Sequence, residues 1–396
     1  MDALHQLLAL PALERQKLGI EHTAAEIAQQ PKTWRDTLSL CRSRRDEIEN
    51  FLAAQRGLPV LLAGAGTSDF IGRAVERVLE HAWRTPVRAV ASTELLTGLD
   101  DWLQPESPAL CISFSRSGDS SEGVAVIEEA LHRFPRVAHL VITCNAEGAM
   151  ARLAHTHRNA FALILDPATN DRGLAMTSSF SNMVIAGQAI AGLDHLESYA
   201  SVLEAMADIA DALLPRAADA ASALAGQGFS RVCFLGSGAL AATALEAALK
   251  VQELTAGRIF TMSQSFLGLR HGPLSFIDAK TLVVGFLASD PQKRRYELDL
   301  LSELKTKSLG ATIAVTGFSI GADTASIANV VFDFGPRAVV PDALRPPLDV
   351  IFGQLLGLFS SLKAGLQPDT PSPTGAISRV VSHVKIYDAQ PVAHIE

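Results

Sequence analysis

The sequence predicts an α/β protein built from two tandem, doubly wound parallel-sheet domains, with a short helical N-terminal segment and an extended C-terminal tail. From residue 58 onward, apolar runs of strand length alternate with helix-length segments, and the whole pattern then occurs a second time. Continuous apolar strands separated by helices indicate a parallel sheet with both faces covered. Residues 61–80 and 232–251 both run strand, Gly-x-Gly turn, helix, which we interpret as an internal duplication.

The chain divides where its composition changes. Residues 1–55 are the helical segment, because Trp34, Leu38 and Cys41 recur at helical spacing with charged residues between them. Residues 56–200 and 201–366 are the first and second domains. Residues 367–396 are the tail, which contains three prolines near its start and then a strand-like segment at 377–387.

The composition argues against several classes of function. The chain has 396 residues, 48% of them hydrophobic and 19% charged, and its formal net charge of −8 argues against a nucleic-acid-binding surface. No apolar run reaches about 18 residues, so we expect no membrane span. The N-terminus is too charged for a secretory signal, which predicts a cytoplasmic protein. The four cysteines lack zinc-ligand spacing, and we expect neither a metal nor another cofactor.

A Gly-Ala-Gly-Thr-Ser loop at residues 64–68 follows the first strand of the first domain and opens its helix. Glycines let the backbone turn tightly, and helix N-terminal N–H groups with two hydroxyls make a cradle for an anion. A glycine turn needed only for packing is about as common, so this loop alone leaves both interpretations open. It lacks the third glycine of a dinucleotide site and the Gly-Lys-Ser/Thr end of a P-loop.

A second loop is richer in hydroxyl groups. Ser115, Arg116, Ser117 and Ser120 lie between the next apolar strand and the next helix, with Gly118 relaxing the backbone. Hydroxyls spaced around a turn can converge on phosphate oxygens. A helix-capping role explains one of these serines, but not three together with an arginine. The two loops therefore predict a phosphate site in the first domain.

A charged stripe crosses an otherwise apolar helix in the second domain. Glu246, Lys250 and Glu253 are spaced i, i+4 and i+7, which places them on one helix face. One interpretation is an exposed ion stripe, whose pairs contribute only about 0.3–0.5 kcal/mol each. The other is an active-site stripe, because this helix follows the glycine turn of the second sheet.

His271 lies in an Arg-His-Gly-Pro turn at residues 270–273. A single loop histidine is most often an ordinary surface residue. The Gly-Pro pair that follows restricts the turn, which keeps a catalytic role open.

Taken in order, these segments resemble the SIS (sugar isomerase) family. The match consists of strand–GAGTS–helix, strand–SRSGDSSE–helix and, in the second domain, strand–GSG–helix. It extends through segments 170–183, 245–258 and 265–277 and covers nearly the whole chain. The chain looks closest to the AgaS-type branch, named for galactosamine-6-phosphate deaminase/ketose-aldose isomerase. The isomerase half of glucosamine-6-phosphate synthase is a more distant relative. The resemblance implies flavodoxin-like domains.

The resemblance also implies roles for individual residues. Glu253 is the expected proton shuttle with Lys250 as its helical neighbour, and His271 helps to open the sugar ring. From the tail, Arg379 or Lys385 is expected to contact the sugar. The residues expected to bind substrate and phosphate are Gly66, Thr67, Ser68, Ser115, Arg116, Ser117, Ser120, Ser179 and Glu246.

By the same comparison, the expected substrate is an amino-hexose 6-phosphate, D-galactosamine 6-phosphate, converted to tagatose 6-phosphate and ammonia. Simple aldose–ketose isomerisation and a non-catalytic sugar-phosphate sensor are the alternatives. In the synthase the corresponding histidine comes from the partner subunit, which implies a homodimer with shared sites. The second domain's turn at 236–238 lacks the Thr-Ser pair, so we expect the phosphate in the first domain.

Overall fold

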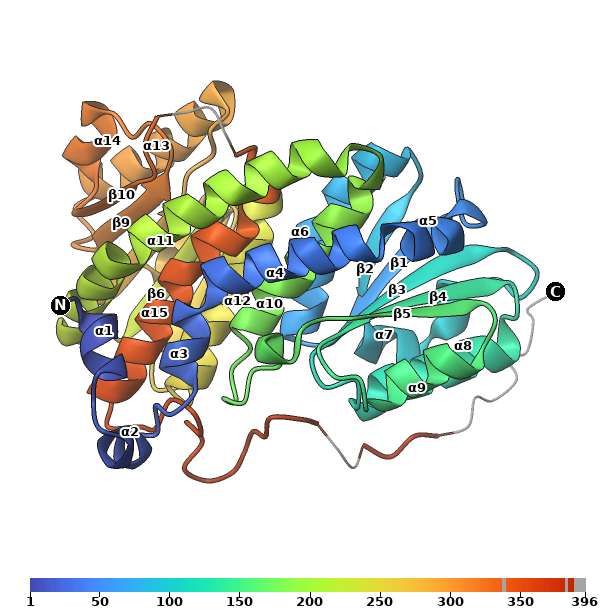
Figure 1. Cartoon of the computed structure of the whole chain (residues 1–396). Helices are drawn as coiled ribbons and strands as arrows, with labels where there is room; N and C mark the ends of the chain where they lie inside the picture. Colours follow the sequence, from blue (N-terminus) through green and yellow to red (C-terminus); the bar gives the residue numbers. More distant parts are fainter. Residues whose placement is uncertain (337–339, 382–383, 388–396) are drawn as a thin grey trace.

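Two parallel sheets organise the chain, as the sequence predicts, and each has five strands (Figure 1). The computed structural model describes residues 1–336, 340–381 and 384–387. The strand order is β2-β1-β3-β4-β5 in the first sheet and β10-β9-β8-β6-β7 in the second, and all neighbouring strands are parallel. The strands are β1 (Val60–Gly64), β2 (Val87–Ala91), β3 (Ala109–Ser115), β4 (Val137–Thr143), β5 (Ala160–Ile164), β6 (Arg231–Gly236), β7 (Phe260–Gln264), β8 (Thr281–Phe286), β9 (Thr312–Gly317) and β10 (Val330–Asp333).

Fifteen α-helices lie in the part of the chain that the structure describes. Those of the N-terminal segment are α1 (Ala3–Leu8), α2 (Ala12–Leu18), α3 (Thr23–Ala28), α4 (Gln30–Ser43) and α5 (Arg45–Ala53). The next six are α6 (Thr67–Trp83), α7 (Ser92–Thr97), α8 (Ser121–Arg133), α9 (Ala149–Thr156), α10 (Ser178–Ala191) and α11 (Leu196–Gly226). The last four are α12 (Ala239–Leu254), α13 (Pro291–Thr306), α14 (Ala322–Ile327) and α15 (Pro346–Lys363).

A shared layer of helices joins the two sheets. α6, which follows β1, packs against α12, which follows β6, while α10 and α15 pack beside them (Figure 1). The 31-residue helix α11 runs along this layer, and the boundary expected between residues 200 and 201 falls inside it. The contact between α6 and α12 sets the first helix after each glycine turn against its counterpart from the other half.

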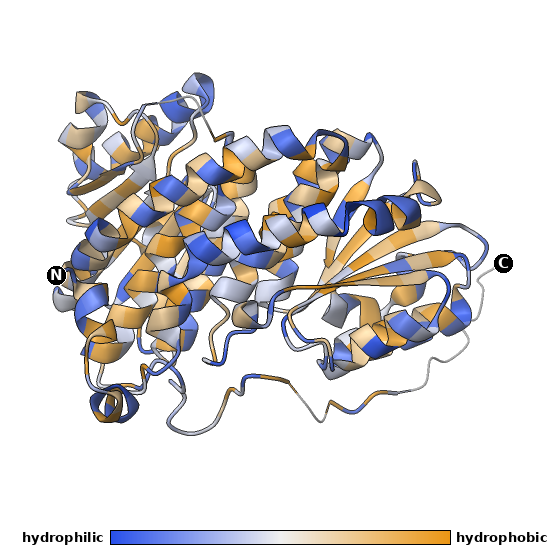
Figure 2. Cartoon of the chain, in the orientation of Figure 1, coloured by the Kyte–Doolittle hydropathy of each residue, from blue (hydrophilic) through white to orange (hydrophobic). Residues whose placement is uncertain are grey.

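The central strands are buried on both faces. All residues of β3 and β4 are buried, and Figure 2 shows the strands of the first sheet as largely hydrophobic, while the helices around it carry hydrophilic stretches. In the parallel register Ala63 pairs with Ser113, and Ser115 pairs with Thr143. The two loops singled out in the sequence therefore leave the same edge of the sheet side by side.

The structure contains two strands that the sequence pattern does not predict. β2 and β7 are the edge strands next to β1 and β6, and each pairs on one side only. Arg88 interrupts the apolar residues of β2, and Thr261 and Ser263 interrupt those of β7, so neither segment forms a continuous apolar run. An edge strand is partly exposed to solvent, so polar residues are tolerated in it. It therefore lacks the continuous apolar run by which a central strand is recognised.

The strand-like tail segment is not a strand in the structure. Residues 377–381 and 384–387 have no strand assignment, and the tail instead runs as irregular chain past the loops of the first domain (Figure 1). Alternating apolar residues are present there, but no described sheet edge pairs with them. The expectation of a C-terminal strand is therefore wrong for these residues.

We predict that His139 makes the fold sensitive to mild acid. Its ring lies fully buried in β4, neither ring nitrogen has a described hydrogen-bond partner, and burial lowers its pKa from the ordinary histidine value of 6.5 to about 4. Between these two values the unfolded chain binds a proton that the folded chain does not, so stability falls as pH falls. The full effect is about 3 kcal/mol.

Urea unfolding of wild type and His139→Leu at pH 7 and pH 4.5 measures this effect. The variant is expected to lose less free energy of unfolding between the two pH values than wild type does. Equal losses in the two proteins would contradict the assignment of this acid sensitivity to His139.

Candidate active site

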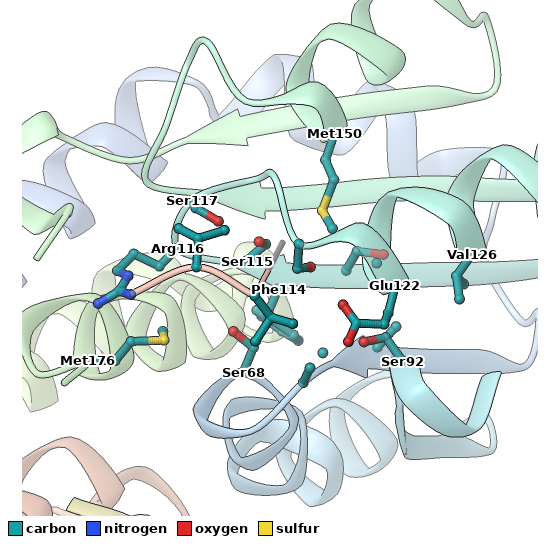
Figure 3. A pocket seen from close by; sticks show the side chains of 18 of the residues that line it. Ser68, Ser92, Phe114, Ser115, Arg116, Ser117, Glu122, Val126, Met150 and Met176 are labelled. Carbon is teal, nitrogen blue, oxygen red and sulfur yellow. The ribbon is translucent and has the colours of Figure 1, made fainter. Parts of the chain in front are cut away.

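A pocket of about 130 Å³ opens at the carboxyl edge of the first sheet, between the ends of β1 and β3. This is the point where the strand order reverses, at which doubly wound sheets bind ligands. Figure 3 shows Ser68 and the serine loop (residues 115–120) around the pocket, with Glu122 and Ser92 on the side away from Arg116. The lining includes Ala65, Ser68, Ser115, Arg116, Ser117, Ser120, Glu122, Ser92, Met150, Met176, Arg379, Val380 and Val381.

The serine loop is held in a conformation in which none of the described residues accepts a hydrogen bond from the hydroxyls of Ser115 or Ser117. Ser115 Oγ accepts the backbone N–H of Gly118 at 3.0 Å, and Ser117 Oγ accepts that of Asp119 at 3.2 Å. Gly118 has φ +67°, a conformation that favours glycine. Ser120 occupies the N-cap position of α8 without a side-chain capping bond. The capping alternative therefore does not account for Ser120, and the serine hydroxyls remain available to a ligand.

Arg116 presents a buried positive charge to the pocket. Its Nη1 donates to the carbonyls of Gly173 and Leu174, its Nη2 donates to the carbonyl of Arg379, and its Nε has no hydrogen-bond partner among the described residues. No described carboxylate forms an ion pair with it, and burial lowers its pKa. A guanidinium whose charge no described carboxylate balances, and whose Nε–H is unpaired among the described residues, is well suited to an incoming anion.

The charged stripe of α12 is largely buried and contacts Thr67 in the first turn of α6, next to Ser68 of the pocket. Lys250 Nζ lies 2.6 Å from Glu253 Oε2 and 3.3 Å from Glu246 Oε1, and it donates to Thr67 Oγ1 at 3.0 Å. The side chains of Glu246 and Lys250 are fully buried, while that of Glu253 is 25% exposed. The exposed-stripe interpretation is therefore wrong for Glu246 and Lys250.

The pKa values of Glu246 and Lys250 depend on burial and on the charges of the neighbouring side chains. Burial raises the pKa of Glu246 to about 8, although the charge of Lys250 opposes this rise. Burial alone would lower the pKa of Lys250, but the carboxylates of Glu246 and Glu253 outweigh it and raise that pKa. Lys250 is therefore a cation at neutral pH, and Glu253 is the member of the group that solvent can reach.

Thr67 and Ser68 are neighbours with different orientations. Ser68 lines the pocket, as expected from the sequence. The hydroxyl of Thr67 instead faces α12, where it also donates to Glu246 Oε1 at 3.3 Å. Gly66 precedes them with φ +57°, in the position before the first turn of α6.

Eight of the expected residues do not line the pocket: Gly66, Thr67, Glu246, Lys250 and Glu253, described above, and Ser179, Lys385 and His271. Ser179 is fully buried in α10, and its Oγ donates to Asp171 Oδ2 at 2.5 Å, so its hydroxyl serves the start of that helix. Lys385 is exposed, with its Nζ 4.6 Å from the ring centroid of Tyr387. His271 is exposed between two short 3-10 turns, and its side chain has no described partner.

Arg379 reaches the pocket in a way that the sequence does not reveal. Its guanidinium donates to Asn170 Oδ1 at 2.6 Å and to the carbonyl of Asp171, while its own carbonyl accepts from Arg116. Val380 and Val381 then continue along the pocket wall. The tail therefore contributes main chain and apolar side chains to the pocket rather than a free cation.

Glu122 and Ser92 are pocket residues that sequence reasoning missed. Glu122 Oε2 and Ser92 Oγ are buried without a hydrogen-bond partner among the described residues. Glu122 lies in the first turn of α8, directly after the serine loop, and this position is the signal that points to it. Ser92 follows β2, so recognising that edge strand would have placed it at the same edge of the sheet.

No three described His, Cys, Asp or Glu side chains are grouped as metal ligands would be. None of the described helices combines the length and apolar character that crossing a bilayer requires.

Comparison with known proteins agrees with this architecture. D-galactosamine-6-phosphate deaminase AgaS from Escherichia coli is 38% identical over 379 residues, which cover 93% of this chain and 96% of that protein. The structure of tagatose-6-phosphate ketose/aldose isomerase from Escherichia coli is 35% identical with a TM-score of 0.85, covering 93% of this chain and 96% of that chain. The C-terminal domain of glucosamine-fructose-6-phosphate aminotransferase from Francisella tularensis, 18% identical with a TM-score of 0.73, shares the fold and covers 89% of this chain and 99% of its own.

The fold and these relatives define an enzyme of the sugar-phosphate isomerase and deaminase class. The sequence profile of the SIS domain matches residues 55–192, the part that contains both pocket loops. The chain belongs to the SIS family, in the branch of the AgaS proteins, which confirms the resemblance seen in the sequence.

We predict that Glu246 weakens the fold as pH rises. Between the ordinary glutamate pKa of 4.5 and the folded value of about 8, the unfolded chain releases a proton that the folded chain retains. Glu246→Gln keeps an uncharged side chain of similar shape and removes this linkage. The stability of the variant relative to wild type is expected to increase between pH 5 and pH 8 by more than about 1.4 kcal/mol, one pKa unit.

The free energy of unfolding in urea at the two pH values checks this. Glu197→Gln, whose side chain is 79% exposed on α11, serves as the matched control and should leave the pH dependence of wild type unchanged. A pH dependence in Glu246→Gln that equals that of wild type would show that Glu246 is ionised in the folded protein.

Proposed function

We propose that this protein converts an amino-hexose 6-phosphate, with D-galactosamine 6-phosphate as the preferred substrate, to tagatose 6-phosphate and ammonia. The observation that carries the proposal is the position of Glu253. This partly exposed carboxylate is held 2.6 Å from Lys250, and Lys250 is hydrogen-bonded to Thr67 beside the pocket of the first domain. An anion pocket and a carboxylate base are thereby joined across the two halves.

The two parts have complementary tasks. The serine hydroxyls, Arg116 and the N-termini of α6 and α8 bind the phosphate group. Binding at this end holds C1 and C2 of the sugar at a fixed position relative to Glu253, which lowers the entropic part of the barrier. Lys250 donates a hydrogen bond to Glu253 Oε2 at 2.6 Å and so holds the carboxylate in position to accept a proton.

The proposed reaction is a proton transfer followed by hydrolysis. His271 assists the opening of the sugar ring, which produces an aldehyde at C1. Glu253 removes the C2 proton while water supplies a proton to the C1 oxygen, which gives an enolamine; Glu253 then returns its proton to C1, which leaves a protonated ketimine at C2. Water then adds to the ketimine carbon, and ammonia leaves as the C2 carbonyl forms. General acid–base transfer of this kind typically contributes about 10²–10⁴-fold to the rate.

Aldose–ketose isomerisation without loss of nitrogen is the second candidate. It uses the same transfer between C2 and C1, and the name of the solved Escherichia coli relative favours it. The name of the deaminase relative, which is 38% identical, favours loss of ammonia. A sensor without catalysis would need the phosphate pocket but not the buried group of α12.

We also propose that the protein acts as a homodimer with shared sites. His271 lies on an exposed turn outside the pocket of its own chain, which supports a role in the site of a partner. The four cysteines are all free, and this supports a reducing, cytoplasmic location.

An ammonia-release assay over a panel of hexosamine and hexose 6-phosphates tests the reaction. Galactosamine 6-phosphate is expected to release ammonia with formation of a ketose phosphate, and Glu253→Gln is expected to lower turnover at least about 10²-fold because it removes the base. Glu197→Gln on the surface is the control. Ketose formation from an aldose phosphate without ammonia from any hexosamine phosphate would establish the second candidate instead.

Mixing two inactive variants tests the shared site. His271→Ala and Glu253→Gln are each expected to be inactive, while their mixed dimer contains one intact site. After random exchange of subunits the mixture is expected to recover about a quarter of wild-type activity. Activity that stays at the level of the separate variants would place His271 and Glu253 in the site of one chain.

A further inference from the structure

The hydroxyl of Thr67 both donates and accepts a hydrogen bond, and both partners belong to the second domain. Thr67 is 4% exposed, its Oγ1 accepts from Lys250 Nζ at 3.0 Å, and its hydroxyl donates to Glu246 Oε1 at 3.3 Å. Both of these partners lie in α12, and both are fully buried. The single hydroxyl hydrogen is therefore committed to Glu246 and is not directed at the pocket.

The next residue faces the other way. Ser68 lines the pocket, and it follows Thr67 in the first turn of α6. A ligand held by Ser68 and by the N-terminus of α6 thus touches the helical turn that carries the Thr67 hydroxyl. One peptide unit separates a group that faces the ligand from a group that faces α12.

Thr67 is the one first-domain residue, within the described chain, whose side chain bonds to Lys250. The other two acceptors of Lys250 Nζ, Glu246 and Glu253, lie on its own helix. An ammonium group has three hydrogens, and these three acceptors satisfy all of them. Loss of the Thr67 hydroxyl would leave one hydrogen of a buried cation unsatisfied, and Lys250 would change its position relative to Glu253.

We propose that Thr67 is a positioning residue that couples occupancy of the anion pocket to the placement of Glu253 through Lys250. This inference rests on the proposed function and assigns Thr67 a task other than phosphate binding. Phosphate binding fixes the first turn of α6, the Thr67 hydroxyl fixes Lys250, and Lys250 fixes the carboxylate. Binding energy from the unreactive end of the substrate is in this way used at C1 and C2.

Three variants separate this role from phosphate binding. Thr67→Val removes the hydroxyl with little change in shape, Thr67→Ser keeps it, and Ser68→Ala removes a group that lines the pocket. Calorimetry with inorganic phosphate gives the Kd of the anion, and steady-state kinetics with galactosamine 6-phosphate give kcat and KM.

Thr67→Val is expected to lower kcat about 10- to 100-fold while the phosphate Kd stays within about twofold of wild type, the split expected when an interaction acts only on the reacting end. Thr67→Ser is expected to restore kcat to within about threefold. Ser68→Ala is expected to raise the phosphate Kd about tenfold, the loss of one good hydrogen bond to a charged group. Where Thr67→Val does not fold, Thr67→Ala replaces it in the same measurements.

A second readout does not depend on turnover. Hydrogen exchange of the backbone amides of residues 246–253 is expected to slow when inorganic phosphate is added to wild type and Thr67→Ser, but not to Thr67→Val. If no sugar phosphate in the panel is turned over, the proposed function fails while this measurement still tests the coupling.

Three outcomes would overturn the inference. One is a phosphate Kd in Thr67→Val that rises as much as in Ser68→Ala while kcat is unchanged, because Thr67 would then be an ordinary phosphate ligand. Another is wild-type kinetics in Thr67→Val. The third is exchange in α12 that does not respond to phosphate in wild type.

Discussion

A lysine buried between two glutamate side chains is the interaction on which the rest of this structure depends. Lys250 is fully buried on α12, and an unpaired ammonium at that depth would cost several kcal/mol. Glu253 compensates its charge from the same helix, Glu246 supplies a second acceptor, and Thr67 supplies the third acceptor from the other half of the chain. The contact between α6 and α12 therefore includes a buried polar cluster, formed by Thr67, Glu246 and Lys250. The two halves are fixed relative to each other where chemistry is proposed to take place.

The duplicated halves have diverged into different tasks. In the first sheet the loops after β1 and β3 leave hydroxyls and an arginine without an internal anion. In the second sheet the corresponding N–H groups after β8 already have internal carboxylates. Ala288 donates to Glu297 at 2.8 Å, and Ser289 donates to Asp342 at 2.8 Å. These carboxylates occupy the place of an anion, so the second half offers no comparable cradle and contributes α12 instead.

The sequence predicts the parts of the fold that are buried on both sides. Continuous apolar runs identify β1, β3 and β4, and the glycine and serine loops follow from the ends of those strands. The edge strands β2 and β7 escape notice because solvent contact interrupts their apolar pattern. The i, i+4, i+7 spacing of the α12 stripe identifies one face, but the spacing does not show that this face is buried, because its burial depends on packing against other elements such as α6.

The direction of individual side chains is less accessible from the sequence. Thr67 bonds to a lysine 183 positions away, and no local pattern specifies that choice over the neighbouring pocket. Ser179 is expected to bind substrate, but its hydroxyl donates to Asp171 at the start of α10. Arg379 looks like a free cation in the tail, but Asn170 and the carbonyl of Asp171 hold its guanidinium. Each case depends on a partner that tertiary packing supplies.

The central claim is that one anion pocket in the first domain presents a sugar to a carboxylate from the second. A crystal structure of Glu253→Gln with galactosamine 6-phosphate bound examines that claim most directly. The account predicts the phosphate among Ser68, Ser115, Ser117 and Arg116, with C1 and C2 within hydrogen-bonding reach of the side chain at position 253. A phosphate bound elsewhere, or a sugar whose C1 and C2 point away from α12, would contradict it.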